Sequence, residues 1–340
     1  MKDQIHNSLP GYGATDRLAD AVEIDRMPVT LCRQDFIAGL PVQETESVQL
    51  APGTAEYRSR RIFGRDFVLL SYSLSPRIVI HTVPKRDWTV LIMPTNPRSD
   101  MTFNGRRSRP FELLLSTGTD GYTTIGKDRQ NIAIAIRTTR LVSACAALAG
   151  VGEEDIGLND LTVPREQVLA QQVHRALTGV AALPGESPLA EVQFSMSKAL
   201  ESDLISLLAA QLAPALRRSP EVNRFRIDAL RVVRAAIDAS KALPSPSLAD
   251  LCAAAGVSQR WLHRCCMEVL GVSPYRYIRL ARLSKAREAL LASANTGDRA
   301  PLIKSLSLSL GYRLSGRFAA DYRSVFGENP SDTLQRSCNP

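Results

Sequence analysis

The chain has 340 residues, which is enough for two domains that each bury a core of their own. Its hydrophobic content of 44% and charged content of 22% are ordinary for a soluble globular protein. No apolar run approaches the roughly 20 residues that a membrane span needs, and the first ten residues lack the build of a signal peptide. We therefore expect a cytoplasmic protein with no membrane partner.

The positive charge is concentrated in the last third of the chain. Residues 222–340 contain 18 Lys and Arg against 9 Asp and Glu, a net charge of +9, whereas the preceding residues contain 24 against 25. A basic domain beside a neutral one indicates a polyanion partner, because each Lys or Arg placed on a phosphate releases a condensed counterion. A solvated basic face is the alternative interpretation of the charge alone.

The first part of the chain has the pattern of a β domain. Residues 1–45 show no clear period and are expected to form a loose lead-in. Between residues 46 and 138, short apolar or alternating runs are separated by turn-forming residues, which predicts strands. The clearest runs are Phe67–Ser73, Ile78–Val83, Trp88–Met93, Phe111–Leu115 and Ile132–Ile136. With no helical pattern between them, they predict an antiparallel sandwich or small barrel, and we expect the barrel.

The period changes near Arg140. Residues 140–149, about 165–182 and about 188–217 carry apolar residues at every third or fourth position, which predicts amphipathic helices. The apolar stripes of the last two helices exceed what one face of a barrel should need to cover it. We therefore expect residues 139–217 to form a helical dimerisation segment of a homodimer.

Residues 247–270 have the pattern of a helix-turn-helix unit. Ser247 is placed to cap a short helix at residues 247–255, and the tight turn 256–258 leads into a second helix at residues 259–270. Leu262, Cys266 and Val269 face inward in that helix. Its outward side chains are polar or basic, namely Gln259, Arg260, His263 and Arg264. A basic second helix after a tight turn is the geometry that fills the major groove of DNA.

The pattern returns after a long basic helix that runs from Tyr275 to Leu291. Ile303, Leu306 and Leu310 predict one helix, and Gly311 predicts the turn after it. The inner face of the next helix is formed by Phe318, Tyr322 and Phe326. The candidates for DNA contact in this second unit are Arg313, Ser315, Arg317 and Arg323.

These two units resemble the DNA-binding domain of the AraC/XylS family of bacterial transcription regulators. The matching residues are Ser258-x-Arg260-x-Leu262-x-Arg264, Gly271-x-Ser273-Pro274-x-x-Tyr277-Ile278, Arg282-Leu283-x-x-Ala286, Gly311-Tyr312, Phe318, Tyr322-Arg323 and Gly327-x-x-Pro330. The resemblance covers about 100 residues and implies a double helix-turn-helix domain at residues 222–338. Its two recognition helices are expected to enter successive major-groove segments of double-stranded promoter DNA.

The resemblance also implies roles for individual residues. It assigns base reading in the first unit to Arg260, His263 and Arg264, with Arg264 best placed for a bidentate contact with a guanine edge. The second unit departs from the family pattern, because Gly316 stands where a small hydroxyl residue is usual and Ala320 where an arginine is usual. We therefore expect the second recognition helix to contact mainly phosphates.

The predicted β domain resembles the cupin-like effector-binding domain that precedes the DNA-binding domain in many family members. The expected fold class is therefore α+β and multidomain, with a cupin-like antiparallel β-barrel at residues 46–138, a helical segment and an all-α C-terminal domain. A metal-dependent cupin enzyme is the rival class, but it needs clustered ligands, and the four histidines His6, His81, His174 and His263 lie far apart in the chain. No catalytic motif is found either. We predict no enzyme activity and no cofactor.

Two short motifs point to an anionic effector. Arg61-x-x-x-Arg65 and Asp100-x-Thr102-x-x-Gly105 resemble, in this order, the cyclic-di-GMP motifs of PilZ domains. In those motifs arginines hold phosphates and guanine faces, and the carboxylate or amide reads a guanine edge. Thr102 replaces the usual serine, and the rest of a PilZ domain is not evident. Cyclic-di-GMP is therefore one candidate effector, beside a sugar, an aromatic acid, a fatty acid or no effector.

The predicted function is a sequence-specific transcription regulator controlled by a small effector, with RNA polymerase as a further candidate partner. The alternative is an interaction protein whose helix-turn-helix domain no longer reads DNA. Salt-dependent, sequence-specific binding to DNA separates the two.

Overall fold

The computed structural model describes the strands and helices of most of the chain. The described residues are 27–28, 40–53, 55–116, 121–158, 161–163, 168–181, 190–216, 224–243, 246–295 and 303–337. The predicted lead-in at residues 1–45 lies largely outside them. Within the described part, the strands precede the helices except for a short strand at residues 161–163, in agreement with a mixed fold that has a helical C-terminal domain.

Two antiparallel sheets form the β domain. The first contains, in spatial order, β1 (Met27–Pro28), β3 (Glu56–Phe63), β4 (Phe67–Ser75), β11 (Arg129–Arg137), β6 (Trp88–Pro94), β9 (Leu113–Ser116) and β12 (Leu161–Val163). The second contains β2 (Val42–Gln49), β5 (Ile78–Pro84), β10 (Tyr122–Gly126), β7 (Thr102–Phe103) and β8 (Arg106–Arg107). The outermost strand β12 lies inside the segment that was predicted to be helical.

The described strands form a sandwich, so the predicted closed barrel is wrong. The two sheets remain separate, and no described strand pairs across them. The edge strands explain this in part, because β8 has two residues and β12 has three, which offers few hydrogen bonds for closing a barrel. The cupin likeness itself stays a prediction.

Strand β4 shows how the layers are built. Its Val68, Leu70 and Leu74 point between the two sheets, while Phe67 and Leu69 point to the outer face of the first sheet. This alternation is the period of two that a strand imposes on its side chains. Every one of these residues is buried, since each face of the sheet is covered.

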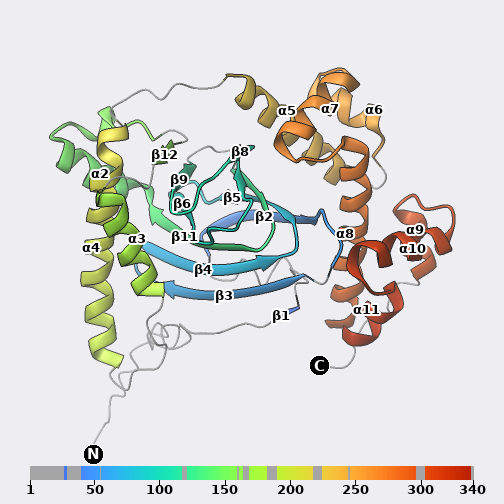
Figure 1. The fold of residues 1–340 in the computed structure, drawn as a ribbon, viewed down its shortest axis with the longest axis horizontal. Helices are drawn as coiled ribbons and strands as arrows, with labels where there is room; N and C mark the ends of the chain where they lie inside the picture. Colours follow the sequence, from blue (N-terminus) through green and yellow to red (C-terminus); the bar gives the residue numbers. More distant parts are fainter. Residues whose placement is uncertain are drawn as a thin grey trace, which may run out of the picture.

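Three helices cover the outer face of the first sheet. They are α2 (Thr138–Ala149), α3 (Val168–Ala181) and α4 (Ala190–Leu216), and a short 3-10 helix, η1 (Glu153–Asp155), follows α2 (Figure 1). The apolar residues of α3 and α4, including Val173, Leu177, Leu204 and Leu208, are buried in one cluster with the sheet. The apolar surface that suggested dimerisation is thus used inside the chain in the described part of these helices. A homodimer stays a prediction.

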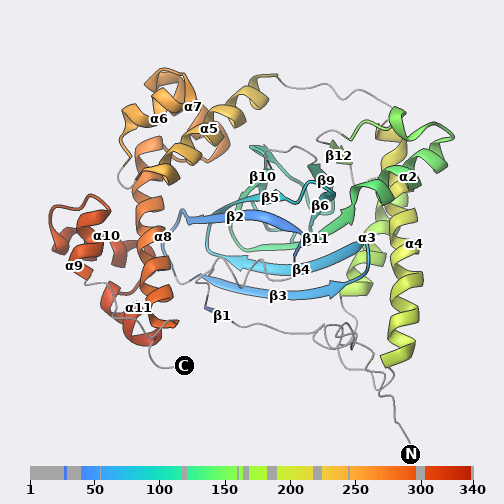
Figure 2. The same ribbon diagram turned by 180° about the vertical axis from the view of Figure 1, so that it is seen from behind.

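Seven helices form the C-terminal domain on the other side of the sandwich. They are α5 (Arg224–Ala242), α6 (Leu248–Ala255), α7 (Gln259–Val269), α8 (Pro274–Asn295), α9 (Ile303–Ser309), α10 (Ser315–Phe326) and α11 (Pro330–Ser337). Val48, Val79 and Ile125 of the second sheet share one buried cluster with these helices. Helices α2 to α4 thus lie at one side of the two sheets and helices α5 to α11 at the other, as both views show (Figures 1 and 2).

None of the helices that the structure describes combines the length and the apolar character required to cross a bilayer. Over the same residues, no group of three or more His, Cys, Asp and Glu side chains is arranged to hold a metal ion.

Candidate nucleic-acid interface

Helix α6 begins with a capping box. The Ser247 hydroxyl accepts a hydrogen bond from the backbone N–H of Asp250 at 3.2 Å, and the Asp250 carboxylate accepts one from the Ser247 N–H at 2.8 Å. The Ser247 hydroxyl also donates to the Asp250 carboxylate at 2.6 Å, and this bond first, then the one from the Ser247 N–H, lowers the pKa of Asp250. The helix ends at Gly256 with φ of 64°, a left-handed conformation that glycine adopts at little cost.

Helix α7 follows the three-residue turn and presents a basic outer face. The Ser258 hydroxyl caps it by accepting from the Trp261 N–H at 3.3 Å. Leu262, Cys266 and Val269 are buried as predicted, and Cys265, which the sequence pattern missed, is buried with them. The four predicted contact residues Gln259, Arg260, His263 and Arg264 are all exposed.

Arg264 is supported by its neighbour on the same helix. Its guanidinium carbon lies 5.6 Å from the centroid of the Trp261 ring, within the range of a cation–π contact. Trp261 in turn is half-buried and packs against the core of the C-terminal domain. The aromatic ring therefore holds the guanidinium group of Arg264 beside α7, on the outer face where Arg264 is exposed.

The second helix pair repeats this arrangement with a weaker start. Helix α9 is followed by Gly311 with φ of 81°, and α10 begins after Leu314 without a side-chain cap. Phe318, Tyr322 and Phe326 are buried on its inner face. The predicted contact residues, Arg313 in the turn and Ser315, Arg317 and Arg323 on the helix, are exposed, as are Gly316 and Ala320 between them.

Helices α8, α10 and α11 are joined by a buried polar network. The Arg287 guanidinium lies 3.0 Å from the Glu328 carboxylate, and the Thr333 hydroxyl donates to the same carboxylate at 2.7 Å. The Tyr322 hydroxyl lies 2.8 Å from that of Thr333, and Arg287 stacks over the Phe326 ring at 4.7 Å. The second helix pair is thereby fixed to the long helix α8 that follows the first pair.

The sandwich contacts both helix pairs. The Gln49 amide donates to the carbonyl oxygen of Val325 in α10 at 3.0 Å, and the Gly53 N–H donates to the same oxygen at 3.1 Å. At the other pair, Gly105 between β7 and β8 packs against Val269 at the end of α7. The second sheet is therefore placed to fix the orientation of α7 relative to α10.

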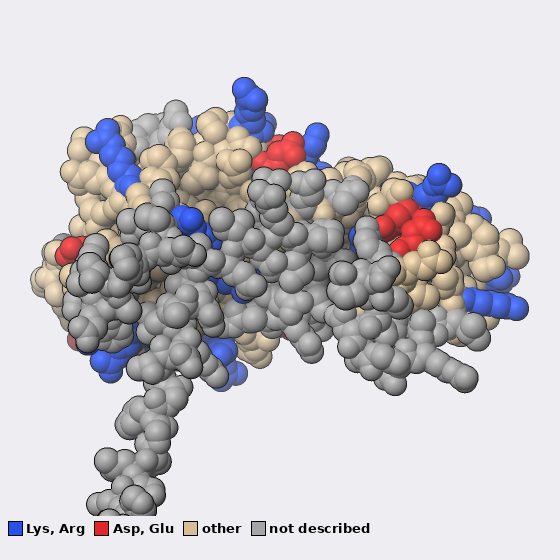
Figure 3. All heavy atoms as spheres, turned by 90° about the horizontal axis from the view of Figure 1, so that it is seen from below, with Lys and Arg blue, Asp and Glu red and all other residues tan. Residues whose placement is uncertain are grey.

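The C-terminal domain carries the excess of basic residues. Figure 3 shows Lys and Arg side chains at its end of the molecule beside acidic ones, and further Lys and Arg side chains elsewhere on the same face. This agrees with the net charge of +9 over residues 222–340. The exposed arginines of α7 and α10 supply the phosphate and base donors that DNA binding requires.

The five predicted effector residues are not gathered at one site. Arg65 lies two residues before strand β4, and its backbone N–H donates to Glu201 of α4 at 3.0 Å. Asp100 lies beyond the other end of β4, where it pairs with Arg77 at 2.6 Å. Because a strand rises about 3.3 Å per residue, the nine residues of β4 separate these two ends by more than 20 Å.

The remaining three effector residues also fall at different places. Arg61 lies on β3 opposite Leu70, in the middle of β4. Thr102 and Gly105 belong to the β7–β8 hairpin, close to Asp100 in the chain and on the side of the C-terminal helices. The prediction of one cyclic-di-GMP site built from all five residues is therefore corrected, because spacing along the chain does not bring them together across the sheets.

A buried cation between the sheets went unnoticed in the sequence. Arg129 is 0% exposed, and its guanidinium donates to the Thr124 hydroxyl at 2.9 Å. Its Nε and Nη2 have no hydrogen-bond partner among the described residues. Burial lowers the pKa of Arg129, an effect that Tyr72 and Asp100 oppose. In the sequence nothing separates it from an ordinary arginine in a turn.

Comparison with known proteins identifies the C-terminal domain. Residues 251–336 match the family model described as "Helix-turn-helix domain". The chain is 40% identical over 92 residues to the XylDLEGF operon transcriptional activator 3 of Pseudomonas putida, and this covers 27% of each protein. It is 31% identical over 106 residues to a probable thc operon regulatory protein of Rhodococcus erythropolis, covering 31% of each.

Among solved structures, the AraC-like transcriptional activator CuxR is similar at 16% identity and a TM-score of 0.37, covering 75% of this chain and 89% of that one. The chain thus spans between a quarter and a third of the length of the two relatives named above. The family match at residues 251–336 thus falls on helices α6 to α11 and identifies this part of the chain as a helix-turn-helix domain.

Proposed function

We propose that the protein is a transcription regulator of the AraC/XylS type that reads promoter DNA with helices α7 and α10. The observation that supports this most directly is α7 itself. Its inner face is buried, and its outer face exposes Gln259, Arg260, His263 and Arg264 directly after a capped tight turn. That combination is the geometry of a recognition helix in the major groove.

The same proposal assigns different roles to the two helices. Helix α7 reads bases, with Arg264 as the main contact, because an arginine fork pairs with the O6 and N7 atoms of guanine. Arg313 in the preceding turn and Arg317 and Arg323 on α10 hold the phosphate backbone. Gly316 and Ala320 supply no side-chain donor, so this helix has fewer groups that could read bases.

The test uses the full chain and a fluorescent DNA fragment from upstream of its own gene. We expect binding with a steep salt dependence and clear preference over a shuffled fragment of equal composition. Arg264→Ala should weaken specific binding by about 1–3 kcal/mol, which is roughly 5- to 150-fold, and leave binding to the shuffled fragment nearly unchanged.

A matched control removes an exposed arginine far from the interface. Arg140→Ala, on α2 at the other side of the sandwich, should leave both affinities unchanged. An equal loss of affinity for the specific and the shuffled fragment in Arg264→Ala would mean that Arg264 contacts only phosphate. No sequence preference in the wild type would favour the interaction protein that does not read DNA.

Control by a small effector in the β domain completes the proposal. Arg129 supports an anionic effector, because a buried guanidinium with unpaired nitrogens gains from an opposite charge. Cyclic-di-GMP remains one candidate of this class, without the five-residue site first assigned to it. Homodimer formation, which was predicted from the apolar stripes of the helical segment, and contact with RNA polymerase are further predictions.

A further inference from the structure

A salt bridge of the β domain lies at the end of the first proposed recognition helix. Arg77 directly precedes strand β5, and its Nη1 atom lies 2.6 Å from Oδ2 of Asp100. The other carboxylate oxygen of Asp100 accepts a hydrogen bond from the Lys127 N–H at 2.6 Å. The carbonyl oxygen of Arg77 accepts one from the Leu50 N–H at 2.8 Å. Groups of the β domain therefore hold both members of the salt bridge in place.

The second nitrogen of the same guanidinium lies beside the turn between α7 and α8. Arg77 Nη2 is 3.2 Å from the position that a Cβ on Gly271 would take. Gly271 has φ of 70°, and its N–H donates to the carbonyl oxygens of Cys266 and Met267 in α7 at 3.1 and 3.2 Å. Because Gly271 has no Cβ, the guanidinium lies directly against the backbone of this turn. The salt bridge thus joins the β domain to the C-terminal end of α7.

The positive charge of Arg77 is favourable at this place. The last carbonyl groups of a helix form the negative end of its dipole, and a cation beside them is stabilised. The side chains of Arg77 and Asp100 are 32% and 41% exposed, however, and solvent weakens the attraction between charges at such sites. We therefore expect the salt bridge to add little to the free energy of unfolding and to act mainly on the orientation of α7.

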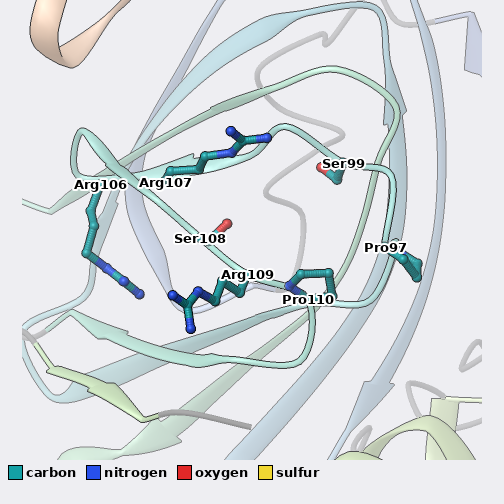
Figure 4. A pocket seen from close by; sticks show the side chains of 7 residues that line it. All are labelled: Pro97, Ser99, Arg106, Arg107, Ser108, Arg109 and Pro110. Atoms are coloured by element: carbon teal, nitrogen blue, oxygen red, sulfur yellow. The ribbon is translucent and has the colours of Figure 1, made fainter.

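The connection between β6 and β9 contacts the end of α7 at a second place. It carries Asp100, and its β7–β8 hairpin turns at Gly105, where an added Cβ would lie 3.5 Å from the Cα of Val269. The same connection lines an open pocket with seven residues, among them the exposed Arg107 (Figure 4). Arg107 thus offers a control arginine in the connection that bears Asp100.

We propose that Arg77 is a positioning residue for α7, which fixes the end of that helix to the β domain and so orients its base-reading side chains. The eleven residues of α7 span about 16 Å, and the proposed base contacts Arg260 and Arg264 lie in its first half. Arg77 therefore acts on base reading without contacting a base. The contact with Gly271 needs no DNA, whereas its consequence for base reading rests on the proposed function.

Amide hydrogen exchange of the free, full chain tests the contact. Arg77→Ala should speed exchange at least about threefold at the N–H groups of Leu270 and Gly271, whose bonds to Cys266 close the end of α7. Exchange in β4 and β11 should stay unchanged, which shows that the variant is folded. Arg107→Ala is the control and should change exchange at neither place.

Binding to the specific and the shuffled DNA fragments tests the consequence. Arg77→Ala should weaken specific binding by about three- to tenfold, because the orientation of α7 must then be fixed on DNA. Binding to the shuffled fragment and the slope of specific affinity against salt should stay unchanged, since no phosphate contact is lost. Arg77→Lys, which keeps the charge but lacks the second nitrogen, should restore specific binding in part.

A substitution of Asp100 tests whether the two residues act together. Asp100→Asn keeps an acceptor for the Lys127 N–H and removes the charge that holds Arg77. We expect a smaller loss of specific binding than in Arg77→Ala, and no further loss when both substitutions are combined. Additive losses would show that Asp100 does not act through Arg77.

Unchanged exchange at the end of α7 in Arg77→Ala would overturn the proposal. Unchanged specific binding despite faster exchange would also overturn it, because the end of α7 would then have no influence on base reading. An equal loss on both fragments with a smaller salt slope would make Arg77 a phosphate contact. Faster exchange in a protein whose wild type shows no sequence preference would support the contact with Gly271 and reject the proposed function.

Discussion

Gly316 and Gly327 stand at the two ends of helix α10 and differ in their backbone conformation. A Cβ added to either would meet no atom within 4 Å, so space is equal at both. Gly316 lies inside the helix, whereas Gly327 ends it with φ of 75°. Gly316 therefore lowers the helix propensity of α10, whereas Gly327 provides the left-handed backbone conformation that the turn requires.

Substitution by alanine should therefore have opposite signs at these two residues. Gly316→Ala should stabilise the protein by about 0.5–1 kcal/mol, because alanine loses less backbone entropy in a helix. Gly327→Ala should destabilise it by about 1–2 kcal/mol, the cost of a left-handed residue with a Cβ. Urea unfolding of the full chain measures both. Destabilisation by Gly316→Ala would mean that its open surface is occupied in solution.

At the scale of elements, the network of Arg287, Glu328 and Thr333 fixes the second helix pair. Glu328→Ala would leave the buried Arg287 guanidinium without its opposite charge, and we expect a loss of about 3–5 kcal/mol in the free energy of unfolding. The matched control is Arg279→Ala, which breaks the more exposed pair with Asp321 at 2.7 Å. That loss should stay below about 1 kcal/mol. Equal losses would show that burial does not decide the strength of these pairs.

Elements that are determined locally were predictable from the sequence, and those that depend on distant pairing were not. Ser247, Gly256 and Ser258 define α6 and α7 through bonds that span three or four residues, and the structure has each of them in its predicted role. Strands such as the one at Ile132–Ile136 were equally predictable from the sequence, because their apolar residues and the turn residues that bound them are close neighbours in the chain. Whether the two sheets stay separate depends on which edge strands pair with each other. No local sequence pattern encodes that pairing.

The candidate site also combines features that local sequence determines with features that depend on distant contacts. The helical period alone predicts that the proposed contact residues of α7 are exposed, and they are; that they contact DNA stays a prediction. The effector motif failed because Arg65 and Asp100 lie at opposite ends of one strand.

In the whole molecule, the sandwich contacts both of the proposed recognition helices, α7 and α10. The second sheet shares a buried core with the C-terminal helices, and its loops contact α7 through Gly105 and α10 through Gln49. A DNA-binding domain of this kind must present its two helices at a fixed spacing to contact successive groove segments. Contacts that set this spacing before DNA arrives reduce the entropy that binding costs.

Gln49 offers the cleanest test of this support. It is 7% exposed, and its amide donates to Val325 in α10 as well as to Ala51 and Gly53 in its own loop. Gln49→Ala should speed amide hydrogen exchange at the end of α10 while exchange in β4 and β11 stays unchanged.

DNA affinity should respond to the same substitution. If the loop orders α10 relative to α7, Gln49→Ala should weaken binding to the specific fragment by about 0.5–1.5 kcal/mol, roughly two- to twelvefold, since that ordering must now occur on DNA. Gln130→Ala, which removes an exposed glutamine side chain from β11, is the control and should have no effect. Tighter DNA binding by Gln49→Ala would contradict the prediction, because it would mean that the sandwich holds α10 in an orientation that opposes DNA.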